Sequence, residues 1–203
     1  MRIYLVRHGQ TAWNKVGRWQ GNQEVPLDEV GIEQTMKLAS KLSQYRVGKI
    51  YASPLKRVAM SADILREKIG GEIVYSQGLR EVHLGEWEGY TSDEIIENYG
   101  ELFHVWVENP AAQIGFGVEN ILDLQDRAYK EFEEIASHEK EDIIIVSHGT
   151  WTRCLLCKLL NIPLENRRGF EVSNTGISVI DCDAAERPPR FTVITLNDVS
   201  HLV

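Results

Sequence analysis

Apolar runs and amphipathic stretches alternate along the chain, and this pattern predicts strands and helices in turn. Short apolar runs that end abruptly in polar or glycine-containing segments are typical of strands buried on both faces. Strands are predicted at Ile3–Val6, Lys49–Ala52, Glu72–Tyr75, Asp142–Val146, Ile177–Cys182 and Phe191–Leu196. The strongest of these signals is the run Asp-Ile-Ile-Ile-Val at residues 142–146. A polar turn containing Pro188-Pro189 is expected between the last two strands.

Apolar residues at helical spacing occupy most of the intervals between these runs. Helices are predicted at Leu27–Leu42, from Ser53-Pro54 to about Ile69, at Ser92–Tyr99, Gly100–Val107 and Val118–His138, and from Gly149 to about Leu160. Asp28 is a candidate cap for the first helix, and Ser53-Pro54 is interpreted as the cap and first turn of the second. The stretch Asn109–Gly117 is rich in Pro, Ala and Gly and is expected to be a loop.

The alternation of strands with helices indicates the fold class. It predicts an α/β fold, a three-layer αβα sandwich with a mainly parallel central sheet and helices on both faces. The chain has 203 residues, no internal repeat and no low-complexity linker. We therefore expect residues 1–203 to form a single domain, because this length suits one domain better than two.

Polar and charged residues follow three of the predicted strands directly, where ligands bind in sheets of this kind. The segments after Val6, Ala52 and Val146 are Arg7-His8-Gly9, Ser53-Pro54-Leu55-Lys56-Arg57 and Ser147-His148-Gly149. Any one of these histidines or arginines, taken alone, is more often structural or solvated. Their joint placement predicts that two histidines and two arginines meet at one edge of the sheet, where the glycines allow close approach of a ligand.

This set of side chains favours chemistry on a phosphoryl group. Arginine carries a permanent charge and a planar fork that matches phosphate oxygens. A neutral imidazole can attack phosphorus and form a phosphohistidine, and nearby cations favour that neutral form. Two histidines with arginines and without a set of carboxylates are a poor metal site. We therefore expect phosphoryl transfer without a metal ion or another cofactor.

A departing alcohol also needs a proton donor. Glu81, in the glycine-rich and charged segment Leu79–Gly89, is the best candidate. Glu86 and Glu88 lie in the same segment, and spacing does not choose among the three carboxylates.

The charge balance limits the classes of partner. Lys and Arg number 22 against 30 Asp and Glu, which gives a net charge of −8. This excess of negative charge argues against general binding to nucleic acid or to an anionic membrane surface. The chain shows neither a run of apolar residues long enough to cross a membrane nor a secretion signal at its start. A cytoplasmic protein that acts on a small phosphorylated metabolite is the expectation.

Three cysteines do not predict a disulfide framework. Cys154 and Cys157 form a C-x-x-C motif within the predicted helix after Gly149, and no second Cys/His pair accompanies them. Packing in the core is the favoured interpretation of this pair over redox or metal chemistry.

Five ordered sequence blocks together resemble the histidine phosphatase superfamily, in its phosphoglycerate-mutase-like branch. The blocks are Leu5-Val6-Arg7-His8-Gly9-Gln10-Thr11 with Asn14, Gln20-Gly21 with Pro26-Leu27 and Gly31, Ser53-Pro54-Leu55-x-Arg57 with Ser61-Ala62, Leu79-x-Glu81 with Gly85-x-Trp87-Glu88-Gly89, and Val146-Ser147-His148-Gly149 with Arg153. The ending Asn197-x-x-Ser200-His201-Leu202 is similar to the family's as well. The resemblance therefore covers the length of the chain.

The resemblance implies a role for each residue of these blocks. His8 is expected to be the nucleophile, and Glu81 the proton donor and later the base for water. The expected binders of the phosphoryl group are Arg7, Arg57 and His148, assisted by Asn14 and the backbone N–H of Gly149. Gln20 and Gly21 are further substrate-binding candidates. Family members often form dimers, so a homodimer is an additional expectation.

Two questions about activity stay open at this level. Mutases that resemble this chain carry inserted segments over the pocket, whereas here the interval between Gly89 and Val146 is short. A less covered site favours water as the acceptor, so a phosphatase is expected ahead of a mutase, and a catalytically silent phosphate-binding module comes third. His83 is the candidate contact for a substrate carboxylate, and Trp87, His104, Trp106, Phe116 and Trp151 are weaker candidates that core packing would also explain.

Overall fold

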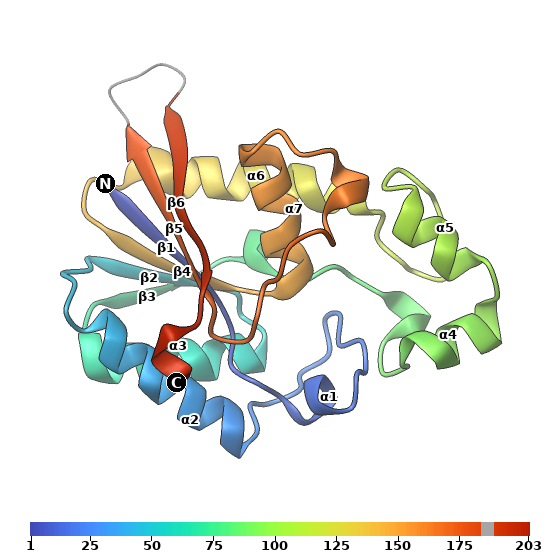
Figure 1. The fold of residues 1–203 in the computed structure, drawn as a ribbon, viewed down its shortest axis with the longest axis horizontal. Helices are drawn as coiled ribbons and strands as arrows, with labels where there is room; N and C mark the ends of the chain where they lie inside the picture. Colours follow the sequence, from blue (N-terminus) through green and yellow to red (C-terminus); the bar gives the residue numbers. More distant parts are fainter. Residues whose placement is uncertain (184–188) are drawn as a thin grey trace.

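A six-stranded sheet forms the middle of the computed structural model, which describes residues 1–183 and 189–203 (Figure 1). The strand order is β3-β2-β4-β1-β5-β6. The strands are β1 (Arg2–Arg7), β2 (Lys49–Ala52), β3 (Glu72–Tyr75), β4 (Ile143–Ser147), β5 (Ile177–Asp183) and β6 (Arg190–Asp198). All six predicted strands are thus confirmed. The predicted turn at Pro188-Pro189 falls largely on residues 184–188, which lie outside the described residues.

The sheet is mixed, with a parallel majority. Strands β3, β2, β4 and β1 run parallel to their neighbours, whereas β5 pairs antiparallel with both β1 and β6. Parallel neighbours need a long crossover connection, and each parallel strand here is reached through at least one helix. The prediction of a mainly parallel sheet is confirmed, and the antiparallel pair occupies one edge.

Helices lie on both faces of the sheet, as the pattern predicts (Figure 1). They are α1 (Ala12–Lys15), α2 (Glu29–Leu42), α3 (Lys56–Ile69), α4 (Ser92–Tyr99), α5 (Leu102–Glu108), α6 (Ile121–His138) and α7 (Gly149–Leu159). Helices α2 and α3 cover one face and α6 and α7 the other, while α1, α4 and α5 lie beyond the carboxyl ends of the parallel strands. None of the described helices has both the length and the apolar character needed to cross a bilayer.

The apolar core forms two layers, one on each side of the sheet. In β1, Ile3 and Leu5 pack with apolar residues of α6 and α7, whereas Tyr4 and Val6 pack with residues of α2 and α3. Successive side chains of a strand point to opposite faces, so a strand covered on both sides must be apolar throughout. This requirement explains the unbroken apolar runs in the sequence and confirms the three-layer arrangement.

The start of α3 differs from the prediction. The helix begins at Lys56, and Leu55 stands at its N-cap without a side-chain hydrogen bond. The interpretation of Ser53 as the cap is therefore wrong. Its hydroxyl lies 2.9 Å from Nε2 of His148 instead, at the carboxyl edge of the sheet.

The starts of three further helices differ from the prediction by two or three residues. Helix α2 begins at Glu29 rather than Leu27, because the side chain of Asp28 caps its first turn, as predicted. Helix α6 begins at Ile121 rather than Val118, because the side chain of Asn120 caps its first turn. Helix α5 begins at Leu102 rather than Gly100, which instead ends α4 with a φ of +58°. Glycine adopts this left-handed conformation readily, so it commonly ends a helix.

Candidate active site

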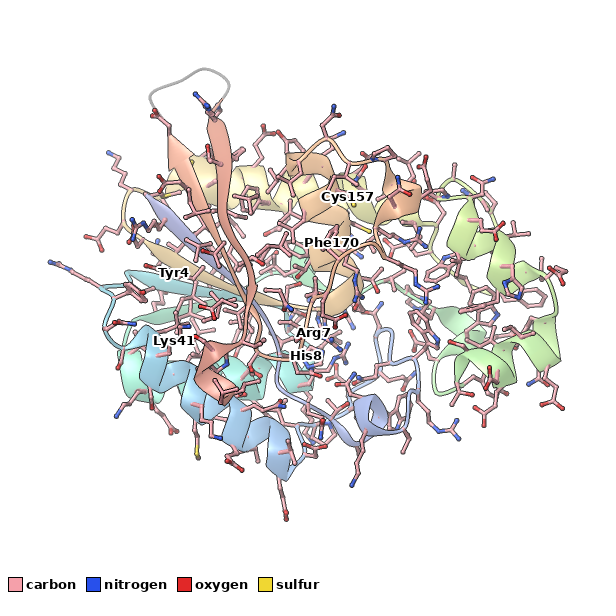
Figure 2. The ribbon with its side chains drawn as sticks, viewed as in Figure 1. Tyr4, Arg7, His8, Lys41, Cys157 and Phe170 are labelled. Carbon is pink, nitrogen blue, oxygen red and sulfur yellow. The ribbon has the colours of Figure 1, made fainter. Side chains whose placement is uncertain are left out.

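The carboxyl ends of β2, β4 and β1 lie side by side and surround a cavity of about 190 Å³. Eight predicted site residues line it, namely Arg7, His8, Asn14, Gln20, Gly21, Arg57, Glu81 and Gly149. Figure 2 shows Arg7 and His8 next to each other where β1 ends. The structure thus brings together residues from four separate parts of the sequence.

The imidazole of His8 is buried, and hydrogen bonds determine its tautomer. Its Nδ1 lies 2.7 Å from the carbonyl oxygen of Gly9, which can only accept a hydrogen bond. Its Nε2 accepts a hydrogen bond from Nε of Arg57 at 3.2 Å. The proton therefore resides on Nδ1, and Nε2 keeps a lone pair. Burial, and then the charges of Arg57 and Arg7, hold the pKa of His8 well below its ordinary value, so the ring is neutral at pH 7.

His148 supports the same edge from a completely buried position. Its ring packs against His8 at a centroid distance of 5.3 Å in an edge-on arrangement. Its Nε2 lies 2.9 Å from the hydroxyl of Ser53, while its Nδ1 is buried without a partner among the described residues. Burial, followed by the charge of Arg57, keeps its pKa well below the ordinary value, so His148 is also neutral. A serine hydroxyl that donates to Nε2 would leave an N–H at Nδ1.

Two buried guanidinium groups supply positive charge. Arg57, in the first turn of α3, is 1% exposed and donates to the carbonyl oxygens of Gly21 and Gln23, each at 2.8 Å. Arg7 donates to the carbonyl oxygen of Val172 at 2.7 Å, and its Nε has no partner among the described residues. Burial lowers the pKa of each guanidinium to about 10, so both remain charged at neutral pH. These fixed cations suit an anionic ligand.

The carboxylate of Glu81 rests on the N-terminus of α7. Its Oε2 accepts the backbone N–H of Thr150 at 3.0 Å, and its Oε1 accepts those of Trp151 and Val82, each at 3.0 Å. The first N–H groups of a helix have no partner within it, and the helix dipole favours a negative charge there. Glu81 alone of the three candidate carboxylates lines the cavity with His8.

The other carboxylates of this segment have different partners. Glu88 accepts the backbone N–H of Asn22 at 2.8 Å and the amide of Gln23 at 2.7 Å. The exposed carboxylate of Glu86 accepts the hydroxyl of Tyr99 at 3.2 Å. Neither residue lines the cavity that contains His8.

The remaining predicted binders lie around these groups. The amide oxygen of Asn14 accepts from the backbone N–H of Thr11 at 3.2 Å, which leaves its NH₂ group for a ligand. Gln20 is 8% exposed, and its amide oxygen has no partner among the described residues. Gly149 is the first residue of α7, so its backbone N–H has no acceptor within the helix.

His83 does not lie in the cavity of His8. It is exposed and lines a neighbouring cavity of about 690 Å³. Its Nδ1 lies 2.8 Å from the carbonyl oxygen of Gly117, and the backbone N–H of Gly85 points at the same nitrogen from 3.1 Å. Glu81 lines both cavities, whereas His8 and His83 line different ones. A contact between His83 and a substrate carboxylate therefore stays a prediction, and it concerns the adjoining cavity.

Most of the weaker aromatic candidates belong to the core. Trp87, Trp106 and Trp151 are at most 2% exposed and pack in the layer around α6 and α7. The interpretation of these three as specificity residues is wrong, and the alternative of core packing is right. His104 and Phe116 are exposed and line neither cavity.

Seven further residues line the cavity and were not predicted as site candidates, namely Arg18, Trp19, Thr150, Arg153, Gly17, Val82 and Leu84. Arg18 and Trp19 belong to a basic and aromatic loop between Gly17 and Gly21. The two glycines could have marked this loop as a candidate contact for a ligand. Arg153 lies one helical turn beyond Gly149, so the period of the helix places it on the same side.

Cys154 and Cys157 pack in the apolar core next to α6. Burial raises the pKa of the Cys157 thiol to about 11, so it is protonated and unreactive at neutral pH. The packing interpretation of this pair is confirmed. Within residues 1–183 and 189–203, His, Cys, Asp and Glu side chains form no cluster that could hold a metal ion.

Comparison with known proteins gives a consistent result over the whole chain. Residues 3–198 match the family described as the histidine phosphatase superfamily (branch 1). Phosphoserine phosphatase 1 of Hydrogenobacter thermophilus is 34% identical over 203 residues, which cover 100% of this chain and 94% of that protein. A protein of Escherichia coli O1:K1 named probable phosphoglycerate mutase GpmB is 29% identical over 205 residues, which cover 100% of this chain and 95% of that one.

Solved structures share this fold. The structure of YhfR from Bacillus stearothermophilus has a TM-score of 0.90 and is 33% identical. The likeness covers 100% of this chain and 99% of that chain. The arrangement of sheet and helices is therefore common to both proteins.

Proposed function

Because the chain belongs to the histidine phosphatase superfamily (branch 1), we propose that it hydrolyses small phosphomonoesters through a phosphohistidine on His8. The observation that carries this proposal is the state of His8, whose Nε2 has a lone pair while Nδ1–H is bound to the carbonyl oxygen of Gly9. Guanidinium groups and an acid lie around the same cavity. The cavity of about 190 Å³ is smaller than the ~300–1,000 Å³ of typical drug-sized sites, which suits a small ester.

In the first step, Nε2 of His8 attacks phosphorus in line with the ester oxygen. The N–P bond forms as the P–O bond breaks, and the departing alcohol takes a proton from Glu81. As the Nε2 lone pair forms the bond to phosphorus, the Nε–H of Arg57 can donate its hydrogen bond to a phosphoryl oxygen instead of to the imidazole. Arg7, Asn14, the Gly149 N–H and His148 Nδ1–H would neutralise the other oxygens.

In the second step, water attacks the phosphohistidine and Glu81 takes its proton. The P–N bond breaks, phosphate leaves, and His8 returns to its neutral form. The three backbone N–H groups on Glu81 suit the ionised state that this step begins from. The first step starts from the protonated form of Glu81 and leaves the carboxylate that the second step uses.

Fixed positive charge takes the role that a divalent cation has in many other phosphoryl-transfer enzymes. Arg7 and Arg57 are permanently charged, buried and held by backbone carbonyl groups. Charge neutralisation and positioning are what phosphoryl transfer chiefly needs. We propose on this basis that the reaction requires no metal ion and no other cofactor.

The proposed function also bears on the partner, the location and the oligomeric state of the protein. We propose a small phosphorylated metabolite as the partner, rather than nucleic acid or a membrane, in keeping with the net charge of −8. One catalytic domain that covers the chain, a cytoplasmic location and a homodimer remain predictions. Strand β3 lies at an edge of the sheet, and Tyr75 there is 48% exposed, so this edge is a candidate for pairing two subunits.

A mutase is the second candidate, because one relative carries that name. A mutase would return the phosphoryl group to a sugar acid, whereas a phosphatase gives it to water. With 3-phosphoglycerate as the substrate, formation of 2-phosphoglycerate identifies a mutase, and release of free phosphate identifies a phosphatase. We expect free phosphate.

The test of the proposed function is hydrolysis of p-nitrophenyl phosphate in the presence of a chelator. Wild-type protein is expected to turn over with the chelator present, and His8→Ala is expected to lose at least about 10³-fold in kcat. His104→Ala removes an exposed histidine outside the cavity and should match wild type. No turnover by wild type would indicate a silent phosphate-binding module, and undiminished turnover by His8→Ala would remove His8 as the nucleophile.

A further inference from the structure

We propose that Arg153 binds a carboxylate on the leaving alcohol, so that the enzyme prefers phosphate esters of hydroxy acids over neutral esters. This role rests on the proposed function and specifies the substrate class of the same site. It assigns recognition of the carboxylate to α7 rather than to His83, which lines the adjoining cavity.

The position of Arg153 places its charge beside the phosphoryl site. It lies one turn along α7 from Gly149. A Cβ atom built on Gly149 would stand 3.8 Å from Nη1 of Arg153 and 3.5 Å from Cζ of Arg7. The two guanidinium groups thus flank Gly149 on the cavity wall, and a negatively charged ligand between them would relieve their repulsion.

The loop that follows Arg167 orients both of these arginines. Nη1 of Arg7 donates to the carbonyl oxygen of Val172 at 2.7 Å, and Nε of Arg153 donates to that of Phe170 at 3.4 Å. Because this bond uses Nε, the outer nitrogens of Arg153 remain available to a ligand.

Of the arginines that line the cavity and lie outside the expected phosphoryl site, Arg153 has the weaker ion pair among the described residues. Four arginines line the cavity, and Arg7 and Arg57 lie beside His8, where the phosphoryl group would bind. Arg18 forms a two-pronged ion pair with Glu94, at 2.7 and 3.1 Å. Within the described part of the chain, Arg153 pairs with Glu171 at 4.0 Å, and the Glu171 side chain is 70% exposed.

The Glu81 carboxylate does not neutralise Arg153 directly. Three backbone N–H groups already hold it, and the proposed mechanism requires it to carry a proton before the ester bond breaks. Once a phosphoryl dianion has matched Arg7 and Arg57, one positive charge remains unmatched. A carboxylate supplies a single negative charge and two oxygens that fit the fork of a guanidinium. A neutral polyol would leave this charge unmatched.

A matched pair of substrates isolates this contact. In 3-phosphoglycerate a carboxylate stands where glycerol 3-phosphate has a hydroxymethyl group, and the phosphate ester is otherwise the same. Wild type is expected to prefer 3-phosphoglycerate in kcat/KM for phosphate release. Arg153→Met should lower kcat/KM for 3-phosphoglycerate ~10- to 100-fold, as expected for loss of a charged hydrogen bond, and change that for glycerol 3-phosphate less than about twofold.

Two further variants serve as controls. Arg153→Lys keeps the charge and should retain much of the preference. Arg168→Met removes an exposed arginine of the same charge that does not line the cavity, and it should leave the ratio of the two kcat/KM values unchanged. Thermal unfolding of each variant shows whether the fold is intact.

Three outcomes would overturn the role of Arg153. They are a wild-type enzyme without preference for the acid, two kcat/KM values that Arg153→Met leaves unchanged, and an equal fold loss on both substrates in that variant. The last would mean that Arg153 contacts the phosphoryl group. In each case p-nitrophenyl phosphate would still be hydrolysed and still depend on His8, whereas failure of the proposed function would abolish that hydrolysis as well.

Discussion

At the scale of single residues, one nitrogen of His8 is bound to the backbone and the other faces the charged groups of the cavity. The carbonyl oxygen of Gly9, 2.7 Å from Nδ1, fixes the tautomer. Burial and the neighbouring guanidinium groups lower the pKa of the ring, which keeps Nε2 unprotonated. In the proposed reaction the same positive charge serves two purposes, because it attracts an anionic ester and keeps Nε2 of His8 free to attack it.

Glu81→Gln tests the proton-transfer role separately from binding. Glutamine keeps the size and one oxygen of the side chain and cannot give up a proton. For an alkyl ester such as 3-phosphoglycerate, whose leaving alkoxide needs a proton, kcat should fall ~10²- to 10⁴-fold. For p-nitrophenyl phosphate the leaving group is a much weaker base, so formation of the phosphohistidine should slow far less.

Rapid-mixing measurement of the initial burst of p-nitrophenol isolates that first step. A burst that survives in Glu81→Gln while alkyl ester hydrolysis is lost supports Glu81 as the acid. Equal losses for the two esters would assign Glu81 to binding or to structure.

At the scale of elements, the loop after β1 packs directly onto the start of α2. Gln10 accepts the backbone N–H of Asp28 at 3.0 Å, and its side chain donates to the carboxylate of Asp28, also at 3.0 Å. A Cβ on Gly31 would collide with the carbonyl oxygen of Gln10 and come within 2.7 Å of its nitrogen. This close approach of two backbones holds the segment that carries His8.

Gly31→Ala is expected to disturb stability and activity together. The added methyl group must displace the loop, which should lower the free energy of unfolding by ~1–3 kcal/mol. Because the loop includes Gly9 and Gln10, kcat should fall as well. Urea denaturation and hydrolysis of p-nitrophenyl phosphate measure the two effects. Ser40→Ala, at an exposed position of the same helix, should change stability by no more than about 0.5 kcal/mol, and a Gly31→Ala protein as stable as this control would contradict the close contact.

At the scale of the whole molecule, two neutral imidazoles buried together make stability depend on pH. The pKa values of His8 and His148 are lowered in the folded protein, whereas in the unfolded chain they lie near the ordinary value of 6.5. Below pH ~6.5 the unfolded chain therefore binds protons that the folded protein does not, and stability falls as the pH falls. Above that pH this contribution is fully present. His201, whose pKa burial also lowers, acts in the same direction.

The free energy of unfolding should therefore decrease on acidification from pH 7 to 5.5. Each histidine contributes up to about 1.4 kcal/mol per pH unit below 6.5. Urea denaturation at several pH values measures the slope, and His8→Asn should make it shallower. Asp198, whose pKa a hydrogen bond from Lys41 lowers to about 2, acts only in a more acidic range. The same slope in His8→Asn as in wild type would show that His8 does not take part.

The sequence itself determined the arrangement of the elements and which side chains meet at the carboxyl edge of the sheet. A parallel strand covered on both faces must be apolar throughout, so runs such as Ile3–Val6 were recognisable without a structure. The carboxyl ends of such strands meet at one edge, which brought His8, Arg57 and His148 together in the prediction. Helix boundaries were less exact, because a cap such as Asn120 competes with an apolar pattern that extends beyond it.

Only the tertiary structure decided the states and neighbours of these groups. The hydrogen bond that Nε2 of His8 accepts comes from Arg57, 49 positions away, and the bond between Ser53 and His148 joins residues 95 apart. His83 and Arg153 carry equally suggestive side chains, yet the fold turns the first into the adjoining cavity and the second beside Gly149. The periodicity and spacing of residues in a sequence indicate structure over a few neighbouring residues, whereas these contacts arise from the packing of distant segments.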